Sequence, residues 1–235
     1  MNEGILRDML LNGAYKLDVQ LDEKAIDKLF LYKDFLKSYN NKVNLTSIVD
    51  EKEIILKHFL DSLTVFKILK ASNNKSVIDI GTGAGFPGLV LKIARESIKL
   101  TLIDSLKKRI VFLEETIKML SLVNVNCVHA RAEELIVSNP NLGEGFDYAV
   151  SRAVASLPKL VEYCLPYVKV GGEFVAMKGP NYVNEMDDAR EVIKALGGEL
   201  IEVKEILLPE SNITRNLIRI EKKTTGNTKY KKSKK

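Results

Sequence analysis

Several residue types are scarce in this sequence, and each shortage excludes a class of protein. There are only two cysteines and two histidines, and there is no tryptophan. So few thiols and imidazoles argue against a metal site, and we expect Cys127 and Cys164 to be buried free thiols in a reducing cytoplasm rather than a disulfide. No apolar run reaches the roughly 18 residues of a membrane span. The first residues also lack the basic segment and apolar core of a secretory signal.

Basic residues are concentrated at the carboxyl end. Residues 222–235 contain seven lysines and no acid, so subtracting these seven from the net charge of +5 leaves residues 1–221 at −2. Such a tail either keeps a protein soluble or binds phosphates without recognising sequence, and composition leaves both possibilities open. Lys231 and Lys232 are its candidates for contact with RNA.

The order of apolar patterns predicts a helical extension followed by one α/β domain. Helical spacing covers residues 21–39 and 51–70, and beyond them β-branched runs alternate with helical stretches, which predicts parallel βαβ units. Two final strands with a short link predict one antiparallel edge strand. We therefore divide the chain into an N-terminal helical extension (1–70), an α/β domain (71–221) and a basic flexible tail (222–235). The predicted strands are 77–80, 100–103, 125–129, 146–150, 173–177, 200–208 and 216–220, with helices at 89–96, 107–121, 157–167 and 184–196.

The strongest local signal is a glycine-rich loop after the first predicted strand, between Asp79 and Gly88. Glycines there let the backbone turn tightly and let a ligand approach main-chain atoms closely. Gly83, Gly85 and Gly88 fit the dinucleotide pattern Gly-x-Gly-x-x-Gly. The loop also fits Asp-x-Gly-x-Gly-x-Gly, the form of a methyltransferase cofactor loop, through Asp79, Gly81, Gly83 and Gly85.

Asp79 favours the methyltransferase interpretation. A carboxylate two residues before the first glycine would repel the pyrophosphate of a nicotinamide cofactor, whereas it favours the sulfonium and amino cations of S-adenosylmethionine. Pro87 supports this choice because it removes an N–H donor from the helix start, where a phosphate cradle needs one. A turn without a ligand is disfavoured because closely spaced glycines carry an entropic cost.

An acidic residue further along supports a ligand that contains adenosine. Asp104 ends the second predicted strand 23 residues after Gly81, near the position where a carboxylate accepts hydrogen bonds from ribose hydroxyls. A strand-end aspartate also often caps a helix, a role that Ser105 can fill instead. Ala132 and Glu133 follow the third strand, where main-chain groups would meet an adenine edge, although alone they indicate only a helix start.

With these residues in place, the chain resembles the bacterial 16S rRNA guanine-N7 methyltransferases, the RsmG or glucose-inhibited division protein B family. The resemblance extends from about residue 41 to residue 220. The tail lacks the proline that this family often carries there, so no tail contact is carried over. The motifs that carry the resemblance are Asn44-Leu45-Thr46, His58-Phe59-Leu60-Asp61-Ser62, Asp79 to Gly88, Leu102-Ile103-Asp104-Ser105, Ser151-Arg152-Ala153 and Met177-Lys178-Gly179.

The resemblance implies a fold, an activity and a set of contacts. The fold is the class I, Rossmann-like S-adenosylmethionine-dependent methyltransferase fold, with a seven-stranded and mostly parallel sheet. The activity is methyl transfer to N7 of one guanine in a decoding-centre loop of 16S rRNA, free or in the small ribosomal subunit, which leaves S-adenosylhomocysteine. The implied cofactor contacts are Gly81, Phe86, Ala132, Glu133 and Arg152.

Methylation of N7 needs no general base, because this nitrogen has an in-plane lone pair and no proton to lose. We therefore expect no acid or base residue and look instead for groups that position the reactants. Arg152 and Lys178 follow the fourth and fifth strands, at the edge where open α/β sheets bind ligands. Arg152 is a candidate for orienting the cofactor or guanine O6, and Lys178 for holding a phosphate or the base.

Polar residues outside the sheet give weaker candidates. His58 and Asp61 share one helix face with Ser62 and Val65 through their spacing. Such a stripe is usually a buried hydrogen-bonding seam, so the residues alone predict a structural role and only the resemblance places them in the site. Arg215 is a candidate RNA contact, with a solvated side chain as the default.

Three other functions stay open on the residues alone. A small-molecule methyltransferase would use the same loop but would gain nothing from a seven-lysine tail. A nicotinamide-linked oxidoreductase is disfavoured by Asp79, and a non-catalytic RNA-binding module needs no cofactor loop. A monomer is the default assembly.

Overall fold

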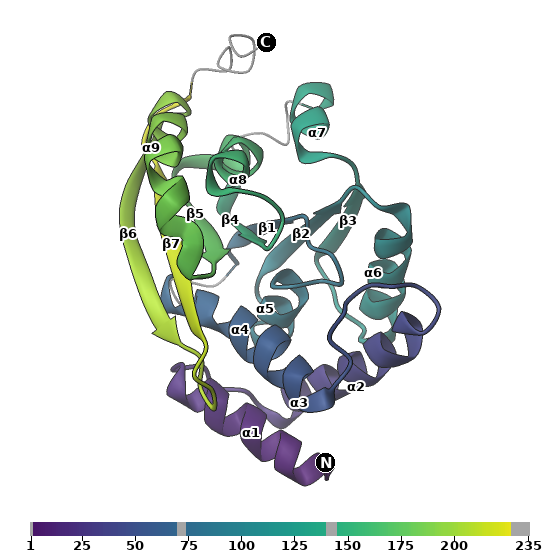
Figure 1. Ribbon diagram of the computed structural model, residues 1–235. Coiled ribbons are helices and arrows are strands. Elements are labelled where there is room, and N and C mark those ends of the chain that lie inside the picture. The colour runs from purple at the N-terminus through teal and green to yellow at the C-terminus, as the bar shows by residue number, and fades with distance from the viewer. Residues whose placement is uncertain (1, 70–73, 140–144, 227–235) are drawn as a thin grey trace.

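The computed structural model describes residues 2–69, 74–139 and 145–226. These residues contain one seven-stranded sheet in the order β3-β2-β1-β4-β5-β7-β6, with helices on both faces (Figure 1). The predicted α/β class and the mostly parallel sheet are confirmed. The strands are β1 (Ser76–Ile80), β2 (Lys99–Asp104), β3 (Val125–His129), β4 (Phe146–Arg152), β5 (Val168–Lys178), β6 (Gly198–Leu207) and β7 (Thr214–Lys222).

The antiparallel strand that the sequence predicts is β7, and it lies one position inside the edge. β7 runs antiparallel to β5 on one side and to β6 on the other, so β6 forms the edge and has the direction of β5. A short link between consecutive strands produces this hairpin. Lys222 ends β7 with 2 % of its surface exposed, so this lysine belongs to the sheet and not to the tail. Lys231 and Lys232 lie outside the described residues.

The helices before β1 form the extension, and the others connect the strands. α1 has no counterpart among the predicted elements, although Leu6, Leu10 and Ala14 recur at helical spacing and are buried. The extension contains α1 (Glu3–Lys16), α2 (Glu23–Asn40), α3 (Glu51–Ile54), a π-helical stretch (Ile55–Leu60), α4 (Asp61–Leu63) and a 3-10 turn (Thr64–Lys67). The connecting helices are α5 (Gly88–Ala94), α6 (Lys107–Met119), α7 (Ala132–Ser138), α8 (Leu157–Cys164) and α9 (Met186–Ala195), with 3-10 turns at Leu165–Tyr167 and Pro180–Glu185.

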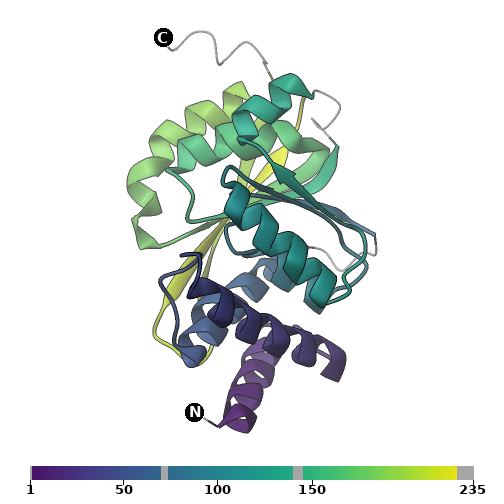
Figure 2. The ribbon, with the colours of Figure 1, turned by 90° about the vertical axis from the view of Figure 1, so that its right-hand side faces the viewer.

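Alternating strand residues divide the core between the two faces of the sheet. Val77 packs with the extension, α5 and α6, whereas its neighbour Ile78 packs with α8 and α9 on the other face. In Figures 1 and 2 the purple and blue N-terminal helices and the green α8 and α9 lie on opposite sides of the molecule. The extension is therefore part of one of the two main cores and has no separate core of its own.

The remaining sequence expectations concern thiols and membranes. Cys127 and Cys164 are both free, as expected, but only Cys164 is fully buried. Cys127 is half-buried because β3 is the edge strand at its end of the sheet. Among the described helices, none combines the length and the apolar character that a bilayer crossing requires.

Candidate active site

The glycine loop leaves the carboxyl end of β1, where the winding of the sheet reverses. β2 lies on one side of β1 and β4 on the other, and open α/β sheets bind ligands in the crevice at such a point. The φ angles of Gly81, Gly83 and Gly85 are +70°, +63° and +100°. Side chains of L residues disfavour this region. The three glycines are therefore required by the backbone of the loop.

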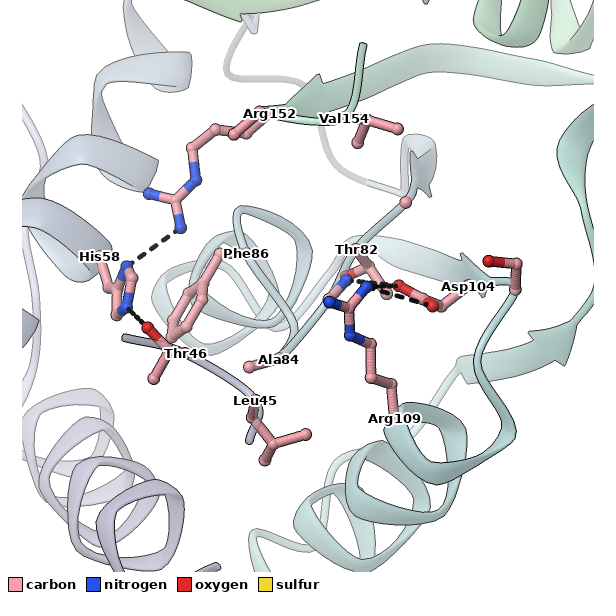
Figure 3. A pocket seen from close by; sticks show the side chains of 14 residues that line it. Leu45, Thr46, His58, Thr82, Ala84, Phe86, Asp104, Arg109, Arg152 and Val154 are labelled. Carbon is pink, nitrogen blue, oxygen red and sulfur yellow. Dashed lines mark hydrogen bonds and ion pairs between the residues drawn. The ribbon is translucent and has the colours of Figure 1, made fainter. Parts of the chain in front are cut away.

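Two adjoining cavities open at this loop. Gly81, Asp104, Ser105 and Val154 line both of them, so they form two halves of one groove with Val154 between them. The smaller half, about 230 Å³, has walls that include Ile80, Ala130, Arg131, Ala132, Glu133 and Tyr163. The larger half, about 400 Å³, has one side that we call the Arg152 wall, made of Leu45, Thr46, His58, Phe86 and Arg152 (Figure 3). We call the opposite side, made of Gly83, Asp104, Ser105 and Arg109, the Asp104 corner.

Asp79 holds the glycine loop through hydrogen bonds to its two ends. Its carboxylate is fully buried, and Oδ2 accepts hydrogen bonds from the Thr82 hydroxyl at 2.7 Å and from the Gly88 N–H at 2.8 Å. Burial raises the pKa of this carboxyl to about 6, although both hydrogen bonds oppose the shift. Asp79 lines neither cavity. It shapes the loop, and direct contact with a cofactor stays a prediction.

Asp104 faces the groove and accepts a main-chain N–H just before α6, although no side chain caps α6 itself. Its Oδ1 accepts the Leu106 N–H at 2.9 Å, at the start of α6. Its Oδ2 accepts the Gly83 N–H at 2.9 Å and Arg109 Nη1 at 3.2 Å. Arg109 Nη1 also lies 3.5 Å from Oδ1, so these contacts use the roughly four acceptor positions of the carboxylate, and ligand hydroxyls would have to replace the long Arg109 contacts.

The start of α7 forms the far end of the smaller cavity. α7 begins at Ala132, and no side chain caps the N–H groups of its first turn. Ala132 and Glu133 line the cavity, and the Tyr167 hydroxyl donates to the Ala132 carbonyl at 2.6 Å. Main-chain donors at a fixed place suit the ring nitrogens of an adenine. Contact of both residues with an adenine stays a prediction.

The segment after β4 covers the loop. The side chain of Val154 lies so close to Gly81 that a Cβ there would be 2.4 Å from Val154 Cγ2. The preceding residue, Ala153, has a φ of +57°, which is uncommon for a residue with a side chain. Gly81 is therefore needed both for its φ and for this close approach.

Lys178 supports that covering segment. Its Nζ donates to the Ala155 carbonyl at 3.2 Å and lies 2.8 Å from Glu185 Oε2, and Glu185 also accepts the Leu157 N–H. Only 14 % of the Lys178 side chain is exposed, and it lines neither cavity. Contact with a phosphate or a base therefore stays a prediction, and the observed role is to hold residues 155–157.

Arg152 extends from the end of β4 to the extension. Its Nη1 donates to the Lys57 carbonyl at 2.8 Å and to Asp61 Oδ2 at 2.9 Å, and its Nη2 donates to His58 Nδ1 at 3.2 Å. Lys57 and His58 lie in the π-helical stretch, and such stretches are frequent at functional sites. The sequence places these groups near one another only through the family resemblance.

Asp61 joins two arginines from different strands. Its carboxylate is 2 % exposed, and Arg215 Nε donates to its Oδ1 at 3.0 Å while Arg152 occupies Oδ2. Arg215 is therefore paired rather than free in solvent, which differs from the default expectation. Contact of Arg215 with RNA stays a prediction. The seam predicted for His58 and Asp61 is present and buried.

His58 is fixed as a neutral ring. It stacks on Phe86 with ring centres 4.3 Å apart, and its Nε2 lies 3.0 Å from Thr46 Oγ1. Burial and the adjacent charge of Arg152 lower the pKa of His58 to about 3. Both ring nitrogens already have protein partners, so the ring has no free position from which to accept a proton.

The extension also holds the loop and the Arg152 wall. The Tyr32 hydroxyl donates to the Ala84 carbonyl inside the glycine loop, and the ring packs on Phe86. Asn40 ends α2, and its Oδ1 accepts the N–H groups of Leu45 (2.8 Å) and Thr46 (3.0 Å) while its Nδ2 donates to the Thr46 carbonyl. α2 therefore ties the Arg152 wall to the glycine loop.

The sequence did not single out Tyr32, which supports the groove, or Thr46, Arg109 and Val154, which line it. Thr46 was quoted only as part of a family motif, and Arg109 carries the weak signal of lying one turn into the helix after Asp104. Tyr32 and Val154 gave no signal, because their roles depend on contacts with distant parts of the chain.

The donor set of the groove fits an adenosine cofactor. Asp104 offers acceptors for hydroxyls, the first turn of α7 offers donors, and a Cβ added at Gly83 would meet nothing within 4 Å, so the loop leaves room for a ligand. In the described part of the chain, no three His, Cys, Asp or Glu side chains gather as metal ligands would.

Comparison with known proteins agrees with this geometry. Residues 25–223 match the family described as GidB, rRNA small subunit methyltransferase G. The chain belongs to this family. A member from Acetivibrio thermocellus, the ribosomal RNA small subunit methyltransferase G, is 51 % identical over 96 % of this chain and 92 % of its own length. The protein of the same name from Alkaliphilus oremlandii is 48 % identical over 96 % of this chain and 94 % of its own.

Solved structures confirm the fold of this methyltransferase G family member. An S-adenosylmethionine-dependent methyltransferase from Aquifex aeolicus aligns with a TM-score of 0.54 at 18 % identity, over 79 % of this chain and 98 % of that one. A precorrin-6y C5,15-methyltransferase from Geobacter metallireducens aligns with a TM-score of 0.53 at 16 % identity, over 70 % and 88 % of the two chains. The class I methyltransferase fold predicted from the sequence is thus confirmed.

Proposed function

We propose that this chain transfers a methyl group from S-adenosylmethionine to N7 of one guanine in 16S rRNA. The observation that carries the proposal is the groove itself. Its smaller half and the Asp104 corner suit an adenosine cofactor, and its larger half continues beside them to a wall of fixed polar groups. The family to which the chain belongs supports the rRNA substrate.

The cofactor is assigned to the half of the groove where its chemistry fits. Asp104 would accept the ribose hydroxyls, the N–H groups of Ala132 and Glu133 would meet the adenine, and Gly81 and Gly83 would let the methionine part approach the loop backbone. Gly85 lines neither cavity and faces Leu89 and the Tyr32 hydroxyl, so its part would be to shape the loop. Phe86 and Arg152 would border the same space. When bound, S-adenosylmethionine supplies an electrophilic methyl group and leaves as S-adenosylhomocysteine.

The chemistry asks the protein for position and not for proton transfer. N7 has its own lone pair, and the best placed imidazole, His58, is neutral with both nitrogens occupied. Fixed groups act without reorganising during the reaction, which is how such sites lower a barrier. Arg152 and His58 are therefore positioning residues, and Asp61 acts through Arg152.

The RNA side of the proposal rests on charge. The lysines of residues 223–235 would add affinity for phosphates that weakens with salt, with Lys231 and Lys232 as the contacts we propose. Lys178 and Arg215 would have to exchange their present partners, Glu185 and Asp61, before contacting RNA. We further propose that the protein acts as a monomer in the cytoplasm.

The test is methyl transfer to the small-subunit rRNA of cells that lack this protein. Labelled S-adenosylmethionine, rRNA or whole small subunits, and the purified chain are incubated, and the RNA is digested to nucleosides. We expect label only in 7-methylguanosine and at one site, and we expect none with Asp104→Ala. Cofactor binding without label in free rRNA or in subunits would overturn the RNA substrate and favour a small-molecule methyltransferase.

A further inference from the structure

Arg152 determines which groups donate and which accept in the hydrogen bonds of the Arg152 wall. A guanidinium carries only donors, so the 3.2 Å contact between Arg152 Nη2 and His58 Nδ1 makes Nδ1 the acceptor. A neutral imidazole has one N–H, and His58 is neutral. The proton therefore resides on Nε2, which points at Thr46 Oγ1 at 3.0 Å.

These contacts leave the Thr46 hydroxyl with only one way to form a further hydrogen bond. Its Oγ1 accepts the His58 Nε2–H and also the Ile48 N–H at 3.1 Å. A hydroxyl has two lone pairs and one O–H, so both acceptor positions are used. No described residue accepts a hydrogen bond from this hydroxyl. Thr46 can therefore act only as a donor, and it lines the larger cavity.

The place of Thr46 points to the base and not to the ribose. Figure 3 shows Thr46 and His58 on one side of the cavity and Asp104 with Arg109 on the other, with Phe86 in between. Asn40 fixes the main chain of Thr46 through both its N–H and its carbonyl. The donor is thus held rigidly in the wall opposite the carboxylate that we assign to the ribose.

We propose that the Thr46 hydroxyl donates a hydrogen bond to O6 of the target purine and so distinguishes guanine from adenine. This inference rests on the proposed function. Guanine presents the acceptor O6 beside N7, whereas adenine presents an amino donor in the same place. Because the Thr46 hydroxyl can donate but not accept, it forms a hydrogen bond with guanine O6 and none with the adenine amino group. Arg152 and His58 are the positioning residues that keep the Thr46 hydroxyl a donor.

The first test compares Thr46→Val with Thr46→Ser. Valine keeps the shape of threonine without the hydroxyl, and serine keeps the hydroxyl. We expect Thr46→Val to lower kcat/KM for the rRNA substrate about 30-fold, and Thr46→Ser to stay within about threefold. Calorimetric affinity for S-adenosylmethionine should be unchanged in both. The thermal unfolding temperature should fall only in Thr46→Val, which leaves the His58 Nε2–H and the Ile48 N–H without an acceptor. A matching loss of cofactor affinity in Thr46→Val would place the hydroxyl on the cofactor and overturn the proposal.

The decisive test removes the other partner of the bond. 2-Aminopurine keeps N7 of guanine but lacks O6, and it is placed at the methylated position of a semisynthetic 16S rRNA, used free or in reconstituted subunits. We expect wild type to lose about 30-fold on this RNA and Thr46→Val to lose nothing further, because one hydrogen bond can be removed only once. Multiplying losses, or equal rates of wild type and Thr46→Val on guanine, would refute the role of Thr46. Wild-type transfer to unmodified rRNA reports the proposed function separately, and its absence would overturn both.

Discussion

At the Asp104 corner the polar groups come from neighbouring strand–loop–helix units, and Asp104 bonds to Gly83 only 21 positions away. At the Arg152 wall the groups come from the extension, the glycine loop and β4, and Asp61 of the extension joins Arg152 to Arg215 of β7 across 91 and 154 positions. The first region is built by local segments, whereas the second exists only once the whole chain has folded.

The two regions also differ in how their polar groups are used. The Asp104 carboxylate at the Asp104 corner and the first turn of α7 in the smaller half both border the groove, and no side chain caps that turn. At the Arg152 wall the charged and aromatic groups bind one another, and Thr46 is left with the donor that faces the cavity. The two regions therefore differ in role: the Asp104 corner is available to bind a ligand, whereas the groups of the Arg152 wall are held in place before any ligand binds. Groups held in place in advance are what transition-state positioning requires.

The largest effect is expected at the Asp104 corner. Asp104→Ala should lower affinity for S-adenosylmethionine about 1,000-fold, because it removes two charge-assisted hydrogen bonds of about 2 kcal/mol each. Titration calorimetry measures this. Asp147→Ala is the matched control, since Asp147 also accepts main-chain and lysine donors but lies at the opposite ends of β1 and β4. Unchanged affinity in Asp104→Ala, or an equal loss in Asp147→Ala, would remove the basis for the cofactor assignment.

The second effect is expected at the Arg152 wall and should appear as stability. Asp61→Asn removes the charge between two arginines, and breaking such a buried pair lowers the free energy of unfolding by about 3 kcal/mol. Denaturant unfolding measures the change. Asp18→Asn removes the exposed partner of Lys67 and should cost less than about 0.5 kcal/mol. Equal costs in the two variants would mean that the Asp61 network is not a structural unit.

The same division explains how much could be predicted from the sequence. The loop, Asp104 and the start of α7 follow strands at characteristic spacings, and the chemistry of S-adenosylmethionine selects among the alternatives. The parallel sheet follows from alternating patterns. The antiparallel strand was expected, but its place inside the edge was not, because a hairpin pattern does not say which of its strands pairs with β5.

For the Arg152 wall, the sequence predicted the seam of His58 and Asp61 and named Arg152, but it did not predict which distant groups pair with one another. Whether Arg215 is solvated or paired depends on Asp61, which lies 154 positions earlier. Lys178 similarly has a partner, Glu185, whose position depends on a 3-10 turn that no periodicity marks. Such contacts arise from tertiary packing of distant elements, which no local pattern encodes.

The third effect is expected where a bound cofactor would pass over the glycine loop, and it is tested by comparing two glycines that both have a positive φ. Gly83 and Gly171 have φ angles of +63° and +79°, and a Cβ at either would meet nothing within 4 Å. Alanine at each should therefore cost a similar stability, about 1 kcal/mol. Only Gly83 lines the groove, so Gly83→Ala should weaken cofactor binding about 30-fold through crowding, and Gly171→Ala should not weaken it. Equal affinities by calorimetry would mean that the ligand does not pass over Gly83.

The smallest effect is a pH dependence that separates the loop from the wall. The folded pKa of His58 is lowered to about 3, below its unfolded value of about 6.5, so the unfolded state takes up a proton first and stability falls as the pH drops below about 6.5. The folded pKa of Asp79 is raised to about 6, so its contribution has the opposite sign: stability rises as the pH falls through 6. Lowering the pH from 7 to 5.5 should cost wild type about 1 kcal/mol relative to His58→Gln and should favour it by a little less relative to Asp79→Asn. Urea unfolding of the three proteins at both pH values measures these differences, and the same sign in both comparisons would contradict the assignment of opposite environments to the two residues.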